Sequence, residues 1–348
     1  MHPDSDLDFV KHYDTFLNLS LAAIKCYDFS HQEELLGYYS KLLNYTLTGG
    51  KLYRGKLLIS IAKALIGTAS PEKWNEILTL GWCVELLQSA FIVADDIMDN
   101  GITRRGKACW HTLPGVGVGN GVNDILFLNT LIYRILSNTI KDRELLLNVM
   151  EFFQRATMAT IVGQSLDTNH TIQQLILHKG TSAYDLFTSI SKNKTGHYSF
   201  LLPIQIGMIC AEIDLNNLNL AKVTKVAMHF GELFQAQDDF LDCFGTAKVI
   251  GKCSTDIQEK KITWLLAKAM QLGSDTQKKL VMDNIGKNDK ESVEIVKNVY
   301  NELNLQGEFE KYEQEKYQQI LHDIKAIDLN EIRKILENKL SSMYKRSK

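Results

Sequence analysis

Apolar residues recur at helical spacing along nearly the whole chain, and few residues interrupt that pattern. Ile125, Leu128, Leu131, Ile132 and Ile135 illustrate it, because residues three and four positions apart share one face of an α-helix. Only four prolines occur in 348 residues, so long helices can run without a break. Strand-like alternation bounded by turn residues is scarce. The pattern predicts an all-α fold of roughly ten or more helices.

No Ser/Gly/Pro-rich linker, low-complexity tract or short repeat divides the sequence. The breaks in the helical pattern are Thr48–Gly50, Pro114–Gly121 and Gly245–Thr255, each compatible with a loop between helices. We therefore expect a single domain over residues 1–348, a helical bundle with a central active-site cavity between facing helices.

The charge balance and the cysteines limit the possible partners and compartments. Lys plus Arg is 39 and Asp plus Glu is 41, a net charge of −2, which argues against a nucleic-acid-binding protein. The six cysteines form no CxxC pair, as in reduced intracellular proteins. The acidic N-terminus has no apolar core, and Thr79–Ala94 and Phe200–Ala211 are too short to span a bilayer. A cytoplasmic protein without a transmembrane segment is expected.

The segment Asp95-Asp96-Ile97-Met98-Asp99 ends a long apolar run. On a helix, Asp95 and Asp99 lie one turn apart on the same face, where their carboxylates repel unless a cation joins them. Mg²⁺ is typically held by a few carboxylates together with substrate phosphates. A single DDxxD motif is more often a solvated helix end. Here, however, Asp238-Asp239-Phe240-Leu241-Asp242 repeats the spacing after a second apolar helix. Two such motifs favour a metal site.

Basic residues flank both motifs and could hold an anionic substrate. Any one of them is more often an ordinary surface residue, but arginine forks and lysine ammonium groups suit diphosphate oxygens. The candidates are Lys51 and Arg54 in a glycine-flanked turn, Arg104, Arg105, Lys194, Lys252 and Lys261.

Seven segments, in order along nearly the whole chain, resemble the farnesyl diphosphate synthases of the trans-isoprenyl diphosphate synthase family. They are Gly49–Gly55, Gln88–Arg105, Gly163–Asp167, Lys194-Thr195, Gly231–Asp242, Gly251–Lys261 and Tyr344–Lys348. The resemblance implies an isoprenoid-synthase helical bundle and a homodimer. It also implies condensation of dimethylallyl or geranyl diphosphate with isopentenyl diphosphate to give farnesyl diphosphate.

The resemblance further implies a role for each matching residue. Three Mg²⁺ ions would clamp the allylic diphosphate, with Asp95, Asp99 and Asp238 as main ligands and Asp96, Asp239 and Asp242 in support. The allylic diphosphate would also contact Arg104, Asp167, Lys194, Lys252 and Lys261. Isopentenyl diphosphate would contact Lys51, Arg54, Gln88, Arg105, Arg346 and Lys348. The allylic cation would be stabilised by the Thr195 hydroxyl, the Lys194 carbonyl and the Gln235 side chain.

Several positions depart from the family pattern. Ala90 and Phe91, one helical turn before the first motif, stand where two aromatic residues often close the chain-length pocket. A fifteen-carbon product is expected, with a twenty-carbon product as the alternative. Tyr53 replaces an Asn, Gly196-His197 replace Ala-Phe, and His111 and Thr246 are also unusual.

These departures leave two alternatives to a synthase. The chain could be a diverged, insect-type copy of the synthase. A diverged copy could also be a terpene synthase that releases a hydrocarbon or alcohol after the same ionisation. The retained bases Lys51, Arg54 and Arg105 argue against it. A catalytically silent partner subunit is disfavoured because both Asp motifs are intact.

Overall fold

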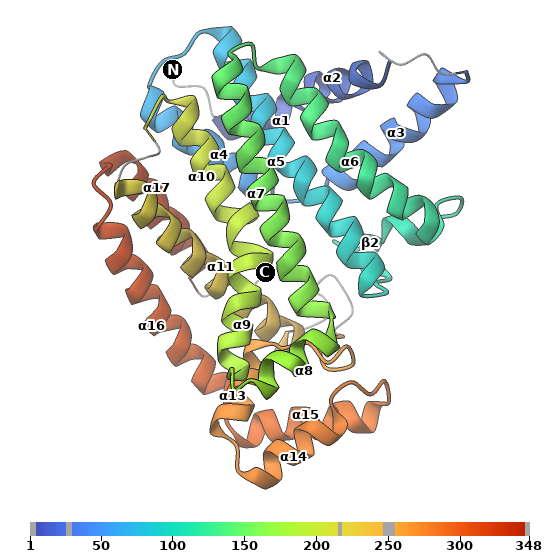
Figure 1. The fold of residues 1–348 in the computed structure, drawn as a ribbon, viewed down its shortest axis with the longest axis vertical. Coiled ribbons are helices and arrows are strands. Elements are labelled where there is room, and N and C mark those ends of the chain that lie inside the picture. Colours follow the sequence, from blue (N-terminus) through green and yellow to red (C-terminus); the bar gives the residue numbers. More distant parts are fainter. Residues whose placement is uncertain (1–4, 26–29, 215–217, 246–254, 345–348) are drawn as a thin grey trace. The chain divides into compact units, whose positions relative to one another are not determined.

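The computed structural model describes residues 5–25, 30–214, 218–245 and 255–344. Most of them are helical, so the prediction of an all-α fold is confirmed (Figure 1). The chain divides into two compact units, which we describe separately. Unit 1 comprises Met1–Thr157 and Tyr198–Leu220, and unit 2 comprises Met158–His197 and Ala221–Lys348. The expectation of a single domain stays a prediction.

Unit 1 is built from the N-terminal helices and one later segment. Its elements are α1 (Ser5–Lys11), α2 (Tyr13–Lys25), α3 (Gln32–Leu47), α4 (Tyr53–Ile66), α5 (Pro71–Met98), β1 (Thr103–Arg104), β2 (Lys107–Ala108), η1 (Trp110–Thr112), α6 (Gly117–Thr139), the first part of α7 (Arg143–Thr168) and α10 (Leu202–Cys210). Helix α5 packs against α4 and α6, and α10 packs against α4.

Helix α5 is the central helix of unit 1. Ser70 caps its start, since the side chain accepts a hydrogen bond from Lys73 N, and Pro71 occupies the first turn, where its missing N–H costs nothing. Most residues from Ile77 to Ala90 are buried on every side. A helix that is apolar all round belongs in the interior, and this one carries the first Asp motif at its last turn.

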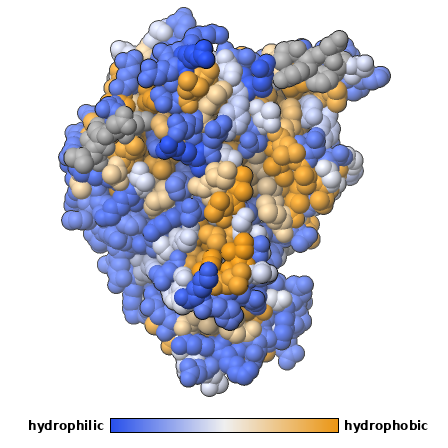
Figure 2. Space-filling view, in the orientation of Figure 1, coloured by the Kyte–Doolittle hydropathy of each residue, from blue (hydrophilic) through white to orange (hydrophobic). Residues whose placement is uncertain are grey.

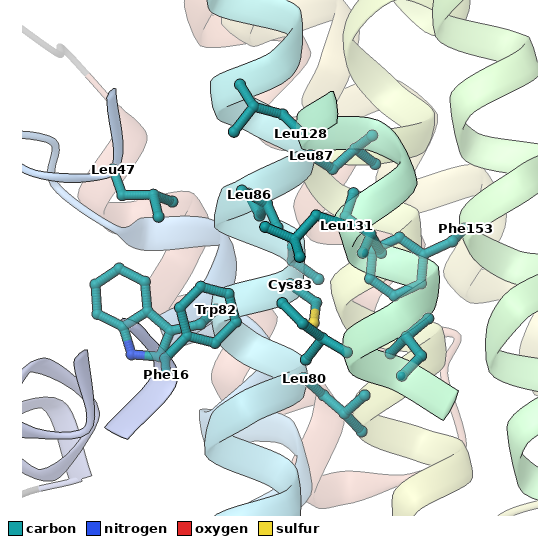
Figure 3. Close-up of a cluster of buried hydrophobic side chains, with 14 of the residues drawn as sticks. Phe16, Leu47, Leu80, Trp82, Cys83, Leu86, Leu87, Leu128, Leu131 and Phe153 are labelled. Carbon is teal, nitrogen blue, oxygen red and sulfur yellow. The ribbon is translucent and has the colours of Figure 1, made fainter. Parts of the chain in front are cut away.

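The core of unit 1 surrounds α5 with large apolar side chains. Trp82 stacks on Phe16 at 5.9 Å between ring centroids, and its indole N–H donates to the Phe9 carbonyl at 3.0 Å. Figure 3 shows Leu131 of α6 and Phe153 of α7 on the other side of α5, both almost fully buried. Burying each such side chain contributes about 1.5–3 kcal/mol, so α5 is held firmly in place.

The short strands β1 and β2 form a hairpin that the sequence did not predict. Thr103 pairs with Ala108 and Arg104 pairs with Lys107, which leaves two residues in the turn. Those residues, Arg105 and Gly106, have φ of 55° and 73°. Positive φ at both positions is the geometry of two-residue hairpin turns. The hairpin therefore holds two consecutive arginines just after the first Asp motif.

Unit 2 contains the rest of α7 and the C-terminal helices. Its elements are α8 (His170–His178), α9 (Ala183–Ser191), the first part of η2 (Lys192–Leu201), α11 (Leu218–Phe244) from Ala221 onward, α13 (Trp264–Leu272), α14 (Asp275–Asn284), α15 (Lys290–Glu302), α16 (Leu305–Lys325) and α17 (Asn330–Met343). Helix α13 packs against α9, α14 against α15, and α16 against α17.

An aromatic cluster joins three helices of unit 2. Phe240 of α11 stacks on Phe309 of α16 at 4.2 Å between centroids, and Phe309 meets the edge of Trp264 of α13 at 5.2 Å. Buried Glu232 of α11 also forms an ion pair of 2.9 Å with Lys316 of α16. Aromatic contacts and a paired buried charge fix α11, which carries the second Asp motif.

The segment η2 is a ten-residue π-helix that continues α9 without a break. A π-helix bonds i to i+5, is rare, and is frequent at functional sites. Gly196, one of the positions that depart from the family pattern, lies within this π-helix. The same segment contains both Lys194 and Thr195.

By length and composition one helix in the described ranges, α5, could cross a membrane. It extends beyond Thr79–Ala94, so the argument from length made on the sequence was wrong. Of its most apolar window, 83% is buried inside the fold, and a buried core helix passes the same test. The absence of a membrane span stays a prediction.

Replacing either of two helical glycines by alanine should change the stability, in opposite directions. A Cβ at Gly207 of α10 would lie 2.8 Å from Ile61 Cβ and 2.9 Å from the Leu58 carbonyl oxygen of α4, whereas a Cβ at Gly37 of α3 would meet nothing within 4 Å. Gly37→Ala should gain about 1 kcal/mol from helix propensity. Gly207→Ala should lose about 1–3 kcal/mol, because α4 and α10 must separate. Urea unfolding of both variants measures the difference, and stabilisation by Gly207→Ala would contradict the close approach of these helices.

Candidate active site

The first Asp motif presents two kinds of carboxylate in unit 1. Asp95 and Asp99 are partly exposed, whereas Asp96 is 4% exposed. Arg104 of the hairpin bridges two of them, since Nη2 lies 3.0 Å from Asp95 Oδ2 and 2.6 Å from Asp96 Oδ1. Burial lowers the pKa of Arg104, but the two carboxylates outweigh it and raise the pKa. The guanidinium thus stays charged and fixes both side chains.

The glycine-flanked turn brings a second set of bases together in unit 1. A Cβ at Gly50 would lie 2.9 Å from the guanidinium carbon of Arg105, so the glycine leaves room for that side chain to lie against the turn. Arg105 is also 3.5 Å from the Thr46 and Thr48 carbonyl oxygens. Burial lowers the pKa of Arg105, and the neighbouring Arg54 and Arg104 lower it further. Such crowding of positive charge favours an anion.

Arg54 is buried in the first turn of α4 with several partners in unit 1. Its Nε donates to Ser199 Oγ and its Nη2 donates to the Tyr198 hydroxyl, both at 3.0 Å. Its guanidinium carbon lies 4.6 Å from the ring centroid of Tyr53 and 4.8 Å from that of Tyr198. Arg54 is therefore held firmly and is only 6% exposed.

Glu85 of α5 organises this basic cluster. The carboxylate accepts the Gly55 backbone N–H at 2.8 Å, at the N-terminus of α4, where the helix dipole favours negative charge. Burial raises its pKa, while Arg54, the Gly55 N–H and Arg105 oppose the rise. One turn further along α5, Gln88 is 8% exposed, and its side-chain oxygen has no hydrogen-bond partner among the described residues. Buried polar atoms rarely lack a partner, so this side chain is a candidate ligand contact.

The second Asp motif, in unit 2, is more buried than the first. Asp238 is partly exposed, whereas Asp239 and Asp242 are 4% and 3% exposed. Asp239 accepts hydrogen bonds from Gln235 Nε2 at 2.9 Å and from Trp264 N at 2.8 Å. Burial and the nearby Asp256 nevertheless raise its pKa well above the ordinary value. A cation nearby would favour its charged form.

A hydrogen-bonded chain links this motif to the π-helix. Thr195 Oγ1 donates a hydrogen bond to Gln235 Oε1 at 2.9 Å. The Gln235 amide nitrogen in turn donates to Asp239 Oδ1, so the three side chains hold one another in fixed orientations. The hydrogen of the Thr195 hydroxyl is thereby committed, so towards any other group this oxygen can act only as an acceptor.

Asp167 of α7 joins two lysines in unit 2. Its Oδ2 is 2.6 Å from Lys194 Nζ and 3.5 Å from Lys261 Nζ. Gly163, one turn earlier, lets α7 touch the π-helix backbone, because a Cβ there would lie 2.6 Å from Lys194 Cα. The predicted residues Asp167, Lys194 and Lys261 are thus brought together.

The departure at Gly196-His197 has a packing explanation. A Cβ at Gly231 of α11 would lie 2.5 Å from Gly196 Cα, and one at Gly196 would lie 3.1 Å from Met228 Sδ. The two glycines let the π-helix and α11 approach closely. Burial lowers the pKa of the half-buried His197, which leaves it neutral near pH 7.

The donor chemistry of the Asp motifs fits Mg²⁺. No group of three or more His, Cys, Asp or Glu side chains in the described ranges could hold a metal by itself. Mg²⁺ needs fewer protein ligands, since it usually binds one or two carboxylates and completes its coordination shell with water and substrate phosphates. The partly exposed oxygens of Asp95, Asp99 and Asp238 meet that requirement.

Three predicted site residues, Lys252, Arg346 and Lys348, lie outside the described residues, as does the unusual Thr246. Conversely, the structure adds Glu85, Tyr198 and Ser199 to the basic cluster. Glu85 could have been noticed as a carboxylate inside an apolar run. Tyr198 and Ser199 follow Lys194-Thr195 closely, but nothing local in the sequence connects them with Arg54.

The comparisons with known proteins identify the family. Residues 37–303 match the polyprenyl synthetase family model. The chain is 38% identical to farnesyl pyrophosphate synthase 2 of Cannabis sativa, over 92% of this chain and 93% of that one. It is 37% identical to farnesyl pyrophosphate synthase 1 of Parthenium argentatum, over 100% of both.

Solved structures agree with the sequences. Farnesyl diphosphate synthase of T. brucei complexed with risedronate superposes with a TM-score of 0.90 at 31% identity, over 99% of this chain and 100% of that one. An all-α fold with two Asp motifs and clustered bases defines a prenyl diphosphate enzyme. The chain belongs to the polyprenyl synthetase family and is a trans-prenyltransferase. The terpene synthase alternative finds no support in these relatives.

Proposed function

We propose that this prenyltransferase joins isopentenyl diphosphate to dimethylallyl or geranyl diphosphate and yields farnesyl diphosphate. One observation in unit 1 carries the proposal. A carboxylate site at Asp95 and Asp99 accepts an anion only through a divalent cation, whereas the arginine cluster at Arg54 and Arg105 accepts one directly. Two different anion environments suit two different diphosphate substrates.

Mg²⁺, expected as three ions, would be held by Asp95, Asp99 and Asp238, with Asp96, Asp239 and Asp242 in support. When bound, it would neutralise the departing diphosphate and so lower the barrier to C–O cleavage. Arg104, Lys194 and Lys261 would add fixed positive charge to the same group, and Lys252 is proposed to do so as well. The protein would hold these positive charges in position before the reaction begins, so no energy would be spent on reorienting them during the reaction.

The proposed reaction breaks one bond and forms another. The allylic C1–O bond breaks, and the Thr195 hydroxyl oxygen, the Lys194 carbonyl and the Gln235 side chain stabilise the cation. The double bond of isopentenyl diphosphate attacks C1 and forms the new carbon–carbon bond. The attack leaves a cation on C3 of the former isopentenyl unit. The released diphosphate takes a proton from the neighbouring C2, which forms the new double bond. Lys51, Arg54, Gln88 and Arg105 hold the second substrate, and Arg346 and Lys348 are proposed to assist.

The decisive experiment incubates the protein with Mg²⁺ and geranyl diphosphate, with and without isopentenyl diphosphate. A longer diphosphate should appear only with both substrates. Asp95→Ala and Asp238→Ala should each lower kcat by about a thousandfold or more, since losing charge stabilisation of the leaving group costs several kcal/mol. Circular dichroism should show both variants folded. Hydrocarbon or alcohol formed from geranyl diphosphate alone would refute the synthase.

We also propose that Ala90 and Phe91 set the product length. Ala90 is 1% exposed within the unit 1 core, whereas Phe91 is half-buried with its ring edge-on to Tyr198 at 5.1 Å. The half-buried ring is therefore the better candidate for the pocket floor, and the small Ala90 side chain is proposed to leave the rest of that floor open.

Changes at these positions should shift the products in opposite directions. Phe91→Ala removes the ring and should lengthen the main product beyond fifteen carbons. Ala90→Phe fills the space and should favour a ten-carbon product. Chromatography of the dephosphorylated prenyl alcohols measures both shifts. An unchanged distribution in both variants would remove these residues from the chain-length pocket.

A homodimer is proposed from exposed apolar stripes. On α6 of unit 1, Val118, Val122 and Leu126 are 55%, 47% and 63% exposed and lie one turn apart on one helix face. Figure 2 shows an apolar patch over α6. In unit 2, α7 exposes Met158, Ile161 and Val162 in the same way. Contiguous exposed apolar residues commonly mark an interface.

Charge placed on the stripe should separate the subunits. Leu126→Glu should shift the protein from dimer to monomer in sedimentation velocity, because a carboxylate cannot be buried cheaply. Leu280→Glu, at an exposed leucine of α14 in unit 2, is the matched control. A dimer unaffected by Leu126→Glu would exclude α6 from the interface.

A cytoplasmic location is proposed as well, since the described cysteines are all free.

A further inference from the structure

The unusual residue Tyr53 contacts a cation that the proposed function needs. The Arg54 guanidinium carbon lies 4.6 Å from the Tyr53 ring centroid and 4.8 Å from that of Tyr198. Both distances fall within the roughly 6 Å range of cation–π attraction, which strengthens when the cation is desolvated. Arg54 is 6% exposed, so this condition is met. We call Tyr53 and Tyr198 the tyrosine pair.

Local backbone geometry places Tyr53 beside its neighbour's guanidinium. Leu52, the N-cap of α4, has φ of 53° and ψ of 32°, a left-handed conformation that a leucine rarely adopts. The chain therefore changes direction at Leu52, and Tyr53 is the first residue of α4. Tyr198 is positioned independently, since the Phe91 ring meets it edge-on.

The hydrogen bonds of Arg54 leave one part of the guanidinium available. The group has five N–H donors in a plane. Ser199 Oγ accepts one from Nε and the Tyr198 hydroxyl accepts one from Nη2. No hydrogen bond to a described residue uses the other three. Planar N–H pairs of this kind match the oxygens of a diphosphate.

We propose that Tyr53 is a positioning residue for isopentenyl diphosphate. Together with Tyr198, its ring fixes the plane of the Arg54 guanidinium, so that the remaining N–H groups meet the diphosphate in a set orientation. The inference rests on the proposed function and assigns this chain's Tyr a role in place of the family's Asn.

The ring, and not the hydroxyl, carries this role. An alternative is that Tyr53 only fills space at the start of α4. A leucine would satisfy that need, but it has no π-electrons to attract a cation. Phenylalanine keeps the ring and loses the hydroxyl. The two variants therefore separate positioning from packing.

The test measures steady-state kinetics for both substrates. Tyr53→Leu should raise KM for isopentenyl diphosphate about tenfold, since one desolvated cation–π contact contributes on the order of the 1.4 kcal/mol that a tenfold change requires. The kcat and KM for geranyl diphosphate should stay within about twofold of wild type. Tyr53→Phe should restore the wild-type KM. Tyr39→Leu, which removes a tyrosine stacked on Phe127 at 3.8 Å, controls for loss of a packed ring.

Other outcomes are decisive as well. An unchanged KM in Tyr53→Leu, or an equal rise in Tyr53→Phe, would overturn the proposal. If Tyr53→Leu does not fold, Tyr53→Met replaces it. If the wild type does not use isopentenyl diphosphate, the proposed function fails separately. Calorimetric titration with inorganic diphosphate then tests the tyrosine pair alone, and weaker binding by the leucine variant than by the phenylalanine variant would support it.

Discussion

Charged side chains buried among helices must find partners, and that requirement shapes both units. Arg104 is held by two carboxylates and Arg54 by two rings and two hydroxyls. Asp167 pairs with Lys194, and Glu232 with Lys316. An isolated ion in an apolar interior costs several kcal/mol, so each pair constrains the helices that carry it. Because these buried charges are paired, apolar side chains can pack closely around the sites.

The sequence allowed the fold class to be predicted, and it named most residues of the candidate site, because both depend on local patterns. Helical periodicity extends over long segments, and the i, i+4 spacing of Asp95 and Asp99 holds on any helix. Three of the predicted bases, Arg105, Lys194 and Lys261, contact residues from the other matched segments. Such patterns survive because they do not depend on distant packing.

Features that depend on contacts distant in sequence were missed. Tyr198 reaches Arg54 across 144 residues, and Glu85 reaches Gly55 across 30. The hairpin at Arg104 is too short to show strand periodicity, and only the Arg105-Gly106 pair hints at its turn. The π-helix arises where Gly196 meets Gly231, which no local propensity reports.

The hairpin after the first Asp motif also limits how this chain can evolve. Its register pairs Arg104 with Lys107 and leaves a turn of two residues. Neighbouring strand residues face opposite sides, so one inserted or deleted residue would turn Arg104 away from Asp95 and Asp96. Substitutions that spare Arg104 and Arg105 can be tolerated in this loop, but a change in its length would break the pairing. The loop therefore keeps a fixed number of residues between the acidic motif and the arginine that pairs with it.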